Sequence, residues 1–398
     1  MSIKEFRFKK NDRGYSEGAF RFARSILVNT GKYFFNPRIT NPEYAPKTGP
    51  CFLFGNHSNY FDPFLINVMM KHEPTAGIMT RDQFHKTLPR IFMDSVGIVP
   101  TSKYVPEPGI IRNVIKMIDQ KRMIVIFPEG GRRWDGKPKP IIATTLKLFW
   151  KMGIPVHPVQ IHGSYLGWPR WADHLRKSSL ELRFIKPIHP SDFKDFQTFS
   201  ETCKSLMDFD EYHPPEEAFP HSCRKPAAGI QRLLYRCPKT GVSGAVFSPE
   251  GEHVYSRETD MSYRMNARSR LVDSDGEEHS IIRIFDQINS MPMETINEDL
   301  LLEKNGCELY KINEEHQLVK LGRGLAQLRQ DTFEVSYGSN HSQLPLSEIR
   351  YTSIEQNHKL TVTTPTQTLQ IDLSGQSALQ WQLYLNRLKE GEKPVKTL

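Results

Sequence analysis

Short apolar runs alternate with amphipathic stretches between residues 50 and 190 of this 398-residue chain. The apolar runs have the length of strands, and the stretches between them have the length and spacing of helices. This alternation predicts an α/β domain with a mostly parallel sheet flanked by helices. The expected strands are 51–54, 76–80, 96–100, 123–127, 155–161 and 180–185. The expected helices are 63–71, 82–94, 110–120 and 141–152.

The pattern changes after about residue 240, where short β-like runs are separated by Gly and Asn turns. The clearest of these strands are expected at 332–337, 346–353, 359–364 and 368–373. A helix is expected at 377–389, with Leu379, Leu383 and Leu388 near one stripe. Antiparallel strands followed by a final helix resemble a pleckstrin-homology-like barrel over roughly 320–390. We therefore expect a smaller, β-rich C-terminal domain.

Residues 15–36 predict an amphipathic basic helix near the start of the chain. The apolar side comprises Phe20, Ala23, Ile26 and Leu27, and the basic flanks are Arg21, Arg24 and Lys32. Two interpretations remain open. The helix lies in a membrane interface with its basic flanks near lipid phosphates, or it packs on its own domain.

These patterns divide the chain into four expected segments. They are an amphipathic helical segment at 1–40, the α/β domain at 41–210, a linker at 211–239 and the β-rich domain with its terminal helix at 240–398. The linker is expected because residues 208–224 are rich in acids, prolines and histidines.

Charge and cysteine content narrow the classes of partner. Residues 1–200 carry 31 Lys and Arg against 16 Asp and Glu, whereas residues 201–398 carry 22 against 29. The basic half predicts contact with anions such as lipid head groups or phosphorylated substrates. Its basic residues are scattered and match no nucleic-acid motif, so we expect no nucleic-acid partner.

The five cysteines form no Cys-x-x-Cys pair, which favours free thiols in a reducing compartment and no metal site.

The location is predicted from the N-terminus and from the hydropathy of the chain. The first residues are highly charged, unlike a signal peptide. No run approaches the roughly 18 apolar residues of a spanning helix. We therefore expect a cytoplasmic protein that acts peripherally, on the cytoplasmic face of a membrane.

The first candidate site motif follows the predicted strand 51–54, where His57 and Asp62 are separated by four residues. A neutral imidazole can take the proton of an attacking hydroxyl, and a carboxylate on the other ring nitrogen fixes the tautomer. The alternative is that Asp62 is only the N-cap of a helix that starts at Pro63.

The second motif, Phe-Pro-Glu-Gly-Gly-Arg at 127–132, follows the predicted strand 123–127. Gly130 and Gly131 allow the backbone to approach an anion closely, and Arg132 offers a planar fork for phosphate. Glu129 is expected to orient Arg132 or to contact a hydroxyl of the bound molecule. The alternative is a tight turn with its charged residues in solvent.

Together these two motifs resemble the glycerolipid acyltransferase family, typified by 1-acyl-glycerol-3-phosphate acyltransferase. Two weaker blocks occur in the family order: 97–103, ending at Lys103, resembles the acceptor-phosphate block, and 153–159 resembles the last block, which is associated with the acyl donor. The resemblance spans about 45–190 and makes 41–210 the expected acyltransferase domain. It departs from the family pattern at three places. The family usually has Arg where this chain has Lys103, often has Thr where it has Gly131, and often has Ser where it has Asn59, the serine here being Ser58. These departures concern the identity of the acceptor.

The resemblance implies direct transfer of an acyl group from a thioester to a lysophospholipid. His57 would be the general base and Asp62 its partner. Glu129, Gly130, Gly131, Arg132 and Lys103 would bind the acceptor. The expected acceptor is 1-acyl-glycerol-3-phosphate, giving phosphatidic acid, and acyl-CoA or acyl carrier protein would be the co-substrate with no further cofactor. The alternatives are another lysolipid or glycerol 3-phosphate as acceptor, or a non-catalytic membrane- or lipid-binding scaffold.

Overall fold

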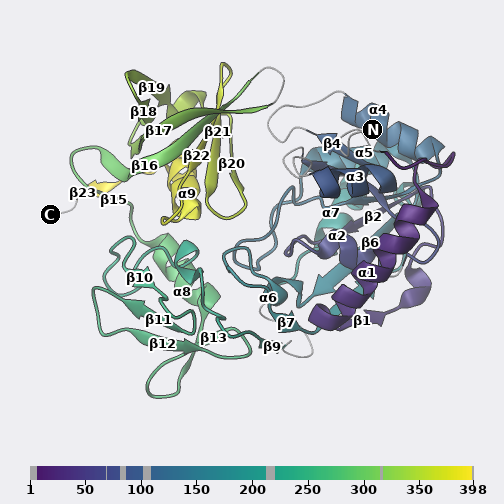
Figure 1. Cartoon of the computed structure of the whole chain (residues 1–398), viewed down its shortest axis with the longest axis horizontal. Helices are drawn as coiled ribbons and strands as arrows, with labels where there is room; N and C mark the ends of the chain where they lie inside the picture. Colours follow the sequence, from purple (N-terminus) through teal and green to yellow (C-terminus); the bar gives the residue numbers. More distant parts are fainter. Residues whose placement is uncertain are drawn as a thin grey trace. The chain divides into compact units, whose positions relative to one another are not determined.

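The computed structural model describes residues 7–68, 70–80, 87–101, 109–211, 220–313 and 317–396. The chain forms two compact units, and Figure 1 labels their helices and strands. Unit 1 comprises residues 1–170 and 175–223, and unit 2 comprises residues 171–174 and 224–398. The predicted segments 1–40 and 41–210 thus lie in unit 1, apart from the short stretch 171–174.

Unit 1 is built on a seven-stranded sheet with the order β1-β8-β6-β2-β5-β3-β4. Every neighbouring pair is parallel except β6 and β8, so the mostly parallel sheet is confirmed. Its strands are β1 Pro37–Thr40, β2 Cys51–Gly55, β3 Ala76–Thr80, β4 Ile98–Thr101, β5 Met123–Ile126, β6 Val156–His162 and β8 Leu180–Phe184. A separate antiparallel pair joins β7 Lys177–Ser178 to β9 His221–Ser222.

Helices cover both faces of this sheet (Figure 1). They are α1 Glu17–Phe35, α2 Asp62–Ile66, α3 Thr87–Val96, α4 Gly109–Asp119, α5 Ala143–Met152, α6 Ser164–Gly167 and α7 Phe196–Ser205. Side chains from α1 and α2 pack on one face, and side chains from α4, α5 and α7 pack on the other.

The central strand β2 explains why the sheet is buried on both sides. Successive side chains of a strand point to opposite faces, so Leu53 packs with the α1 and α2 side while Phe52 and Phe54 pack with the other. All five residues of β2 are buried. A side chain at Gly55 would place its Cβ 2.6 Å from the carbonyl oxygen of Val159 on β6, so the close approach of these strands requires glycine.

The strand order brings three loops to one edge. Strands β5, β2 and β6 are parallel neighbours, and the carboxyl ends of parallel strands lie at the same edge of a sheet. The segment 56–61 follows β2, the turn 127–132 follows β5 and the start of α6 follows β6. Both sequence motifs therefore emerge at the edge where α/β proteins carry their sites.

Unit 2 contains two antiparallel sheets. The first has the order β10-β11-β12-β13-β14, with strands at Val246–Phe247, His253–Ser256, Ser262–Met265, Arg270–Val272 and Glu278–Ser280, and is followed by α8 Ile281–Ser290. The second has the order β19-β18-β17-β16-β22-β21-β20. Its strands are β16 Leu300–Ile312, β17 Leu318–Arg329, β18 Thr332–Tyr337, β19 Asn340–Pro345, β20 Tyr351–Glu355, β21 Lys359–Thr363 and β22 Thr368–Asp372. Helix α9 Ala378–Lys389 ends this module, and β15 Glu294–Thr295 pairs with β23 Val395–Lys396.

The antiparallel, β-rich C-terminal region with a final helix is thus confirmed. The strand predicted at 346–353 is wrong in part, because 346–348 forms a 3-10 turn and the strand begins at Tyr351. The helix predicted at 63–71 already ends at Ile66. The side chain of Asn67 ends the helix there. Its Nδ2 donates to the backbone carbonyl of Pro63 (2.8 Å), and its Oδ1 accepts from the backbone N–H of Thr75 (2.9 Å).

Helix α1 packs on its own unit and also leaves apolar side chains in solvent. Phe20 and Phe35 are buried, whereas Phe22, Ile26 and Tyr33 are 71%, 52% and 62% exposed. The exposed residues are spaced by four and seven, so they share one side of the helix. No described helix has the length and apolar content needed to cross a bilayer.

Candidate active site

His57 and Asp62 form a hydrogen-bonded pair at the edge of the sheet. His57 Nδ1 and Asp62 Oδ2 are 3.0 Å apart. An ionised carboxylate only accepts, so Nδ1 carries the proton and Nε2 keeps its lone pair. The His57 ring stacks on Phe127, with centroids 4.4 Å apart and planes at 22°. With its side chain 21% exposed, His57 can meet a substrate, while Asp62 is fully buried.

The Asp62 carboxylate accepts hydrogen bonds from the loop before it. Its Oδ2 accepts the backbone N–H groups of Ser58 (2.7 Å) and Asn59 (2.8 Å). The hydroxyl of Ser164, at the start of α6, donates to Oδ1. The helix N-cap is Phe61 and makes no side-chain cap bond, so the interpretation of Asp62 as a simple cap is wrong. This carboxylate instead orients His57 and its loop and ties them to the start of α6.

The glycine turn after β5 is tied to the same loop. The backbone N–H of Arg133 donates to the carbonyl oxygen of His57 at 2.9 Å. Gly130 has a φ of +67°, and a Cβ there would lie 2.5 Å from Ile142 Cδ1. Gly131 has no such clash, since the nearest atom to its ideal Cβ is Lys139 Nζ at 3.4 Å. Glycine is therefore favoured at 130 by its φ, since the contact is with the end of the exposed Ile142 side chain, which can move.

Glu129 has a different partner from the one that the sequence suggested. Its carboxylate accepts the Nη2 (2.6 Å) and Nε (3.0 Å) groups of Arg133, not those of Arg132, and both side chains are fully buried. Arg133 also donates to the carbonyl oxygens of Met207 (3.2 Å) and Phe209 (2.8 Å). This buried pair holds the turn to a distant segment, so contact between Glu129 and an acceptor is not favoured.

Arg132 is left available to a ligand by this arrangement. It is half-buried, and its guanidinium makes no hydrogen bond or ion pair with any residue that the structure describes. Burial lowers the pKa of Arg132, while the charges of Asp62 and Tyr60 oppose the shift. A partly desolvated guanidinium without a fixed partner is stabilised by an anion. Its backbone carbonyl accepts from Arg170 Nη1 (3.1 Å), which fixes the position of the turn.

A second buried carboxylate lies behind the pair. Glu211 Oε1 accepts from Asn56 Nδ2 (2.7 Å) and from Ser58 Oγ (2.8 Å). Its Oε2 accepts from the backbone N–H of Gly163 (3.1 Å). Burial raises the pKa of the Glu211 carboxyl from 4.5 to about 7, against the lowering effect of Arg133.

Aromatic side chains flank the same edge. Phe61 and Trp168 have ring centroids 5.9 Å apart, and Tyr60 meets Trp168 edge-on at 6.2 Å. Phe61 also contacts Phe35 of α1, with centroids 5.6 Å apart. The residues just before Asp62 and the residue that ends α6 thus form an aromatic cluster with α1.

The structure thus brings most of the predicted site residues together. His57, Asp62, Gly130, Gly131 and Arg132 come from two neighbouring loops joined by a backbone hydrogen bond. Lys103 lies outside the described residues. Sequence reasoning missed Arg133, Ser164 and Glu211. The spacing of four between Glu129 and Arg133 predicts an ion pair only on a helix, and residues 127–142 form none; nothing local marks Ser164 or Glu211 either.

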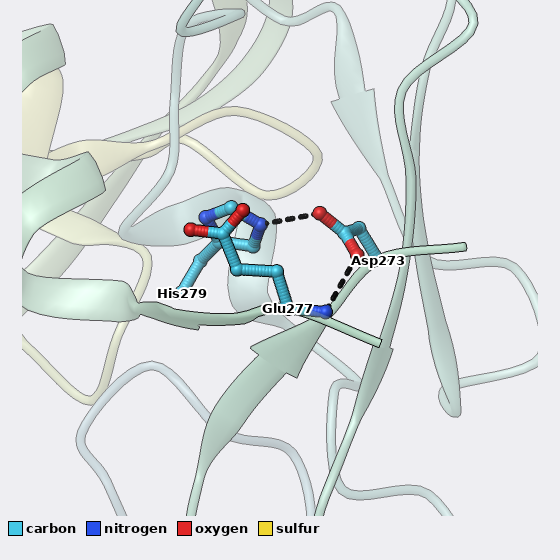
Figure 2. Close-up of side chains that lie close together, drawn as sticks. All are labelled: Asp273, Glu277 and His279. Carbon is cyan, nitrogen blue, oxygen red and sulfur yellow. Dashed lines mark hydrogen bonds and ion pairs between the residues drawn. The ribbon is translucent and has the colours of Figure 1, made fainter. Parts of the chain in front are cut away.

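One group of possible metal ligands lies in the turn between β13 and β14 of unit 2. Figure 2 shows Asp273, Glu277 and His279, whose ligand atoms lie within 4.8 Å of one another. Asp273 Oδ1 accepts from the amides of Asp275 (3.0 Å) and Glu277 (2.8 Å), and Oδ2 meets His279 Nε2 at 2.7 Å. These bonds are those of an ordinary hairpin turn, and we assign no metal to them. All five cysteines are free thiols, as expected.

The segment that carries both loops is also the part of the chain that is similar to known proteins. The sequence model of the Acyltransferase family matches residues 36–162. The "1-acyl-sn-glycerol-3-phosphate acyltransferase" of Bacillus subtilis is 22% identical over 156 residues, which are 39% of this chain and 75% of that protein. The protein of the same name from Limnanthes alba is 24% identical over 84 residues, 21% of this chain and 30% of that protein. Residues 36–162 are thus similar to the Acyltransferase family, and the chain is distantly similar to 1-acyl-glycerol-3-phosphate acyltransferases.

The extent of these matches is limited. The chain spans about 30% of the length of the two Limnanthes relatives and 46% of a Brassica napus relative. Among solved structures, the 1-acyl-sn-glycerophosphate (LPA) acyltransferase PlsC from Thermotoga maritima is similar, with 22% identity and a TM-score of 0.41 over 48% of this chain and 80% of that one. The family match ends at His162, so Ser164 and Glu211 lie beyond it.

Proposed function

We propose that this protein transfers a fatty acyl group from acyl-CoA or acyl carrier protein to the free hydroxyl of a lysophospholipid. The observation that carries the proposal is the His57–Asp62 pair, with Nδ1 bonded to the carboxylate (3.0 Å) and Arg132 on the adjoining turn. The distant relatives that are named as 1-acyl-sn-glycerol-3-phosphate acyltransferases favour 1-acyl-glycerol-3-phosphate as acceptor and phosphatidic acid as product.

In the proposed reaction, His57 Nε2 takes the proton of the acceptor hydroxyl as its oxygen attacks the thioester carbonyl carbon. Asp62 stabilises the imidazolium that forms. The new C–O bond replaces the C–S bond, and the proton passes from Nε2 to the departing thiolate. Direct attack by the acceptor accounts for a site built on a base and not on a nucleophilic Ser or Cys.

Recognition of the acceptor is assigned to its phosphate and to Arg132. The guanidinium is half-buried and unpaired among the described residues, which suits a bidentate contact with phosphate oxygens. The aromatic cluster that includes Phe61 and Trp168 offers apolar surface for an acyl chain.

The test is an acceptor panel with product identification by mass spectrometry. Lysophosphatidic acid, glycerol 3-phosphate, lysophosphatidylcholine and monoacylglycerol are each offered with acyl-CoA and with acyl carrier protein. We expect lysophosphatidic acid to be acylated and monoacylglycerol, which lacks the phosphate, to be a poor substrate. Turnover of another lysolipid or of glycerol 3-phosphate alone would reassign the acceptor. No turnover of any acceptor would favour a lipid-binding scaffold.

Arg132→Ala tests the acceptor assignment within the same assay. Loss of a charge-assisted contact costs about 1.5–3 kcal/mol, so the KM for a phosphorylated acceptor should rise by about 10- to 150-fold. Arg38→Ala is the control, because Arg38 is an exposed cation of unit 1 that pairs with Glu181 (3.6 Å) and not with the site. An unchanged KM in Arg132→Ala would contradict the phosphate contact.

We also propose that helix α1 lays its exposed side on the membrane that carries the acceptor, at the cytoplasmic face. Phe22, Ile26 and Tyr33 supply apolar surface, and Arg21 and Lys32 lie exposed beside them. Arg24 is not available for lipid phosphates, because it donates to the carbonyl oxygens of Met70 (3.1 Å) and Val68 (3.2 Å).

A further inference from the structure

Glu211 lies about 150 residues after the His57 loop in sequence but contacts it directly. One oxygen of its carboxylate accepts from the side chains of Asn56 (2.7 Å) and Ser58 (2.8 Å), the two residues that flank His57. A single buried carboxylate therefore holds the chain on both sides of the histidine.

The other residues of this network lead to Asp62. Ser58 donates its hydroxyl to Glu211 and its backbone N–H to Asp62 Oδ2 (2.7 Å). Glu211 Oε2 accepts from Gly163 N–H (3.1 Å), and the next residue, Ser164, donates to Asp62 Oδ1. Both routes to Asp62 thus begin at Glu211.

Asn56 extends the same restraint to strand β6. Its amide donates to the carbonyl oxygen of Ile161 (3.0 Å), and its side-chain oxygen accepts the Ile161 N–H (2.8 Å). Asn56, Ser58 and Glu211 are all buried. Because a side chain locked by several bonds in a buried site has few alternative positions, the loop around His57 is pre-organised.

We propose that Glu211 is a positioning residue for the reaction, which fixes the geometry of the His57–Asp62 pair through Asn56, Ser58 and Gly163. This inference rests on the proposed function. Its role as a hydrogen-bond acceptor is specific, because Asn56, Ser58 and Gly163 all donate to the carboxylate. An amide in its place would turn an N–H group toward either Gly163 or the Asn56–Ser58 pair. Glu211 does not need to touch a substrate to act in this way.

Glu211→Gln is the primary test, measured in two ways. Steady-state kinetics report kcat and KM, and ¹⁵N NMR of histidine-labelled protein reports the tautomer of His57, assigned with His57→Ala. We expect kcat to fall by up to about 100-fold, the scale on which misplacement of a catalytic group acts, with little change in KM. We also expect the Nδ1–H form of His57 to give way to a mixture of tautomers.

Glu181→Gln is the matched control. Glu181 is another buried carboxylate of unit 1, and it pairs with Arg183 (3.1 Å) and accepts from Thr40 (2.5 Å), away from the His57 loop. It should leave both kcat and the His57 signals unchanged. Glu211→Gln with wild-type kcat and wild-type His57 signals would overturn the proposal.

A third variant covers the case in which Glu211→Gln does not fold. Ser58→Ala removes only the hydroxyl contact with Glu211 and keeps the N–H bond to Asp62. It should shift the His57 signals in the same direction by a smaller amount, and unchanged signals would again overturn the proposal. If wild type acylates no acceptor, the proposed function fails while the NMR comparison still decides the positioning role.

Discussion

The backbone N–H of Arg133 donates to the carbonyl oxygen of His57, with N and O 2.9 Å apart. This bond joins two loops that are about 75 residues apart in sequence. It makes the turn that carries Arg132 part of the same rigid edge as the His57–Asp62 pair. A change in the conformation of the turn should therefore reach His57.

Gly130→Ala should disturb both stability and turnover. With a φ of +67°, alanine meets backbone strain of about 1–2 kcal/mol, and the flexible end of Ile142 must also move aside. We expect a lower melting temperature and a lower kcat. Gly131→Ala is the control, because its Cβ would have room. Equal stability and kcat in the two variants would contradict the preference for glycine at 130.

Glu129→Gln should lower the free energy of unfolding and leave acceptor binding unchanged. Removing one partner of a buried ion pair costs about 3–5 kcal/mol, and Glu129 and Arg133 are both fully buried. Thermal unfolding should report the loss, while the KM for the acceptor stays near the wild-type value in the folded protein. A raised KM with unchanged stability would restore the sequence-based expectation that Glu129 contacts the acceptor.

Stability should depend on pH through Glu211. Burial raises its pKa from 4.5 to about 7, with Arg133 lowering and Asp62 raising it. The folded state then binds this proton more tightly than the unfolded chain does, so stability falls as pH rises from about 4.5 to about 7 and the loss is complete above that range.

The comparison that checks this pH dependence is the melting temperature of Glu211→Gln minus that of wild type. The variant cannot titrate at this position, so the difference should increase in its favour between pH 5 and pH 7 and then level off. A difference that is constant over this range would show that the carboxyl titrates at its ordinary value.

The α/β architecture could be predicted because it depends on local patterns, and the His57–Asp62 pair because its motif, together with residues 127–132, resembles that of a known family. The β3 and β18 spans match their predicted bounds, since a continuous apolar run marks β3 and alternation of apolar and polar residues marks β18. Long strands β16 and β17 were not predicted individually, because their residues are mostly polar or only partly buried over much of their length.

The parts of the site that depend on tertiary contacts could not be read from the sequence. Glu129 pairs with Arg133 and not with the adjacent Arg132 because the Arg133 side chain is the one that is buried. Arg133 is held there by hydrogen bonds to the carbonyl oxygens of Met207 and Phe209. Glu211 is identified as a site residue only by the approach of a distant segment to Asn56 and Ser58.

Membrane binding should depend on the exposed side of α1. Phe22→Ser with Ile26→Ser removes two exposed apolar side chains without touching the buried Phe20 and Phe35. Binding to vesicles of phosphatidylcholine and phosphatidylserine should weaken by about 100-fold or more, since burying each of the two side chains is worth about 1.5–3 kcal/mol. Ile296→Ser, at a position that is 62% exposed in unit 2, is the control. Equal binding by both proteins would contradict docking through α1.

The rate of acyl transfer in His57→Ala, measured beside wild type and His72→Ala, tests the central claim most directly. His72 is an exposed histidine of the same unit and serves as the control. We predict that His57→Ala loses about 10²- to 10⁴-fold in kcat, the usual contribution of a general base, and that His72→Ala keeps the wild-type rate. A folded His57→Ala protein that transfers acyl groups at the wild-type rate would contradict the account.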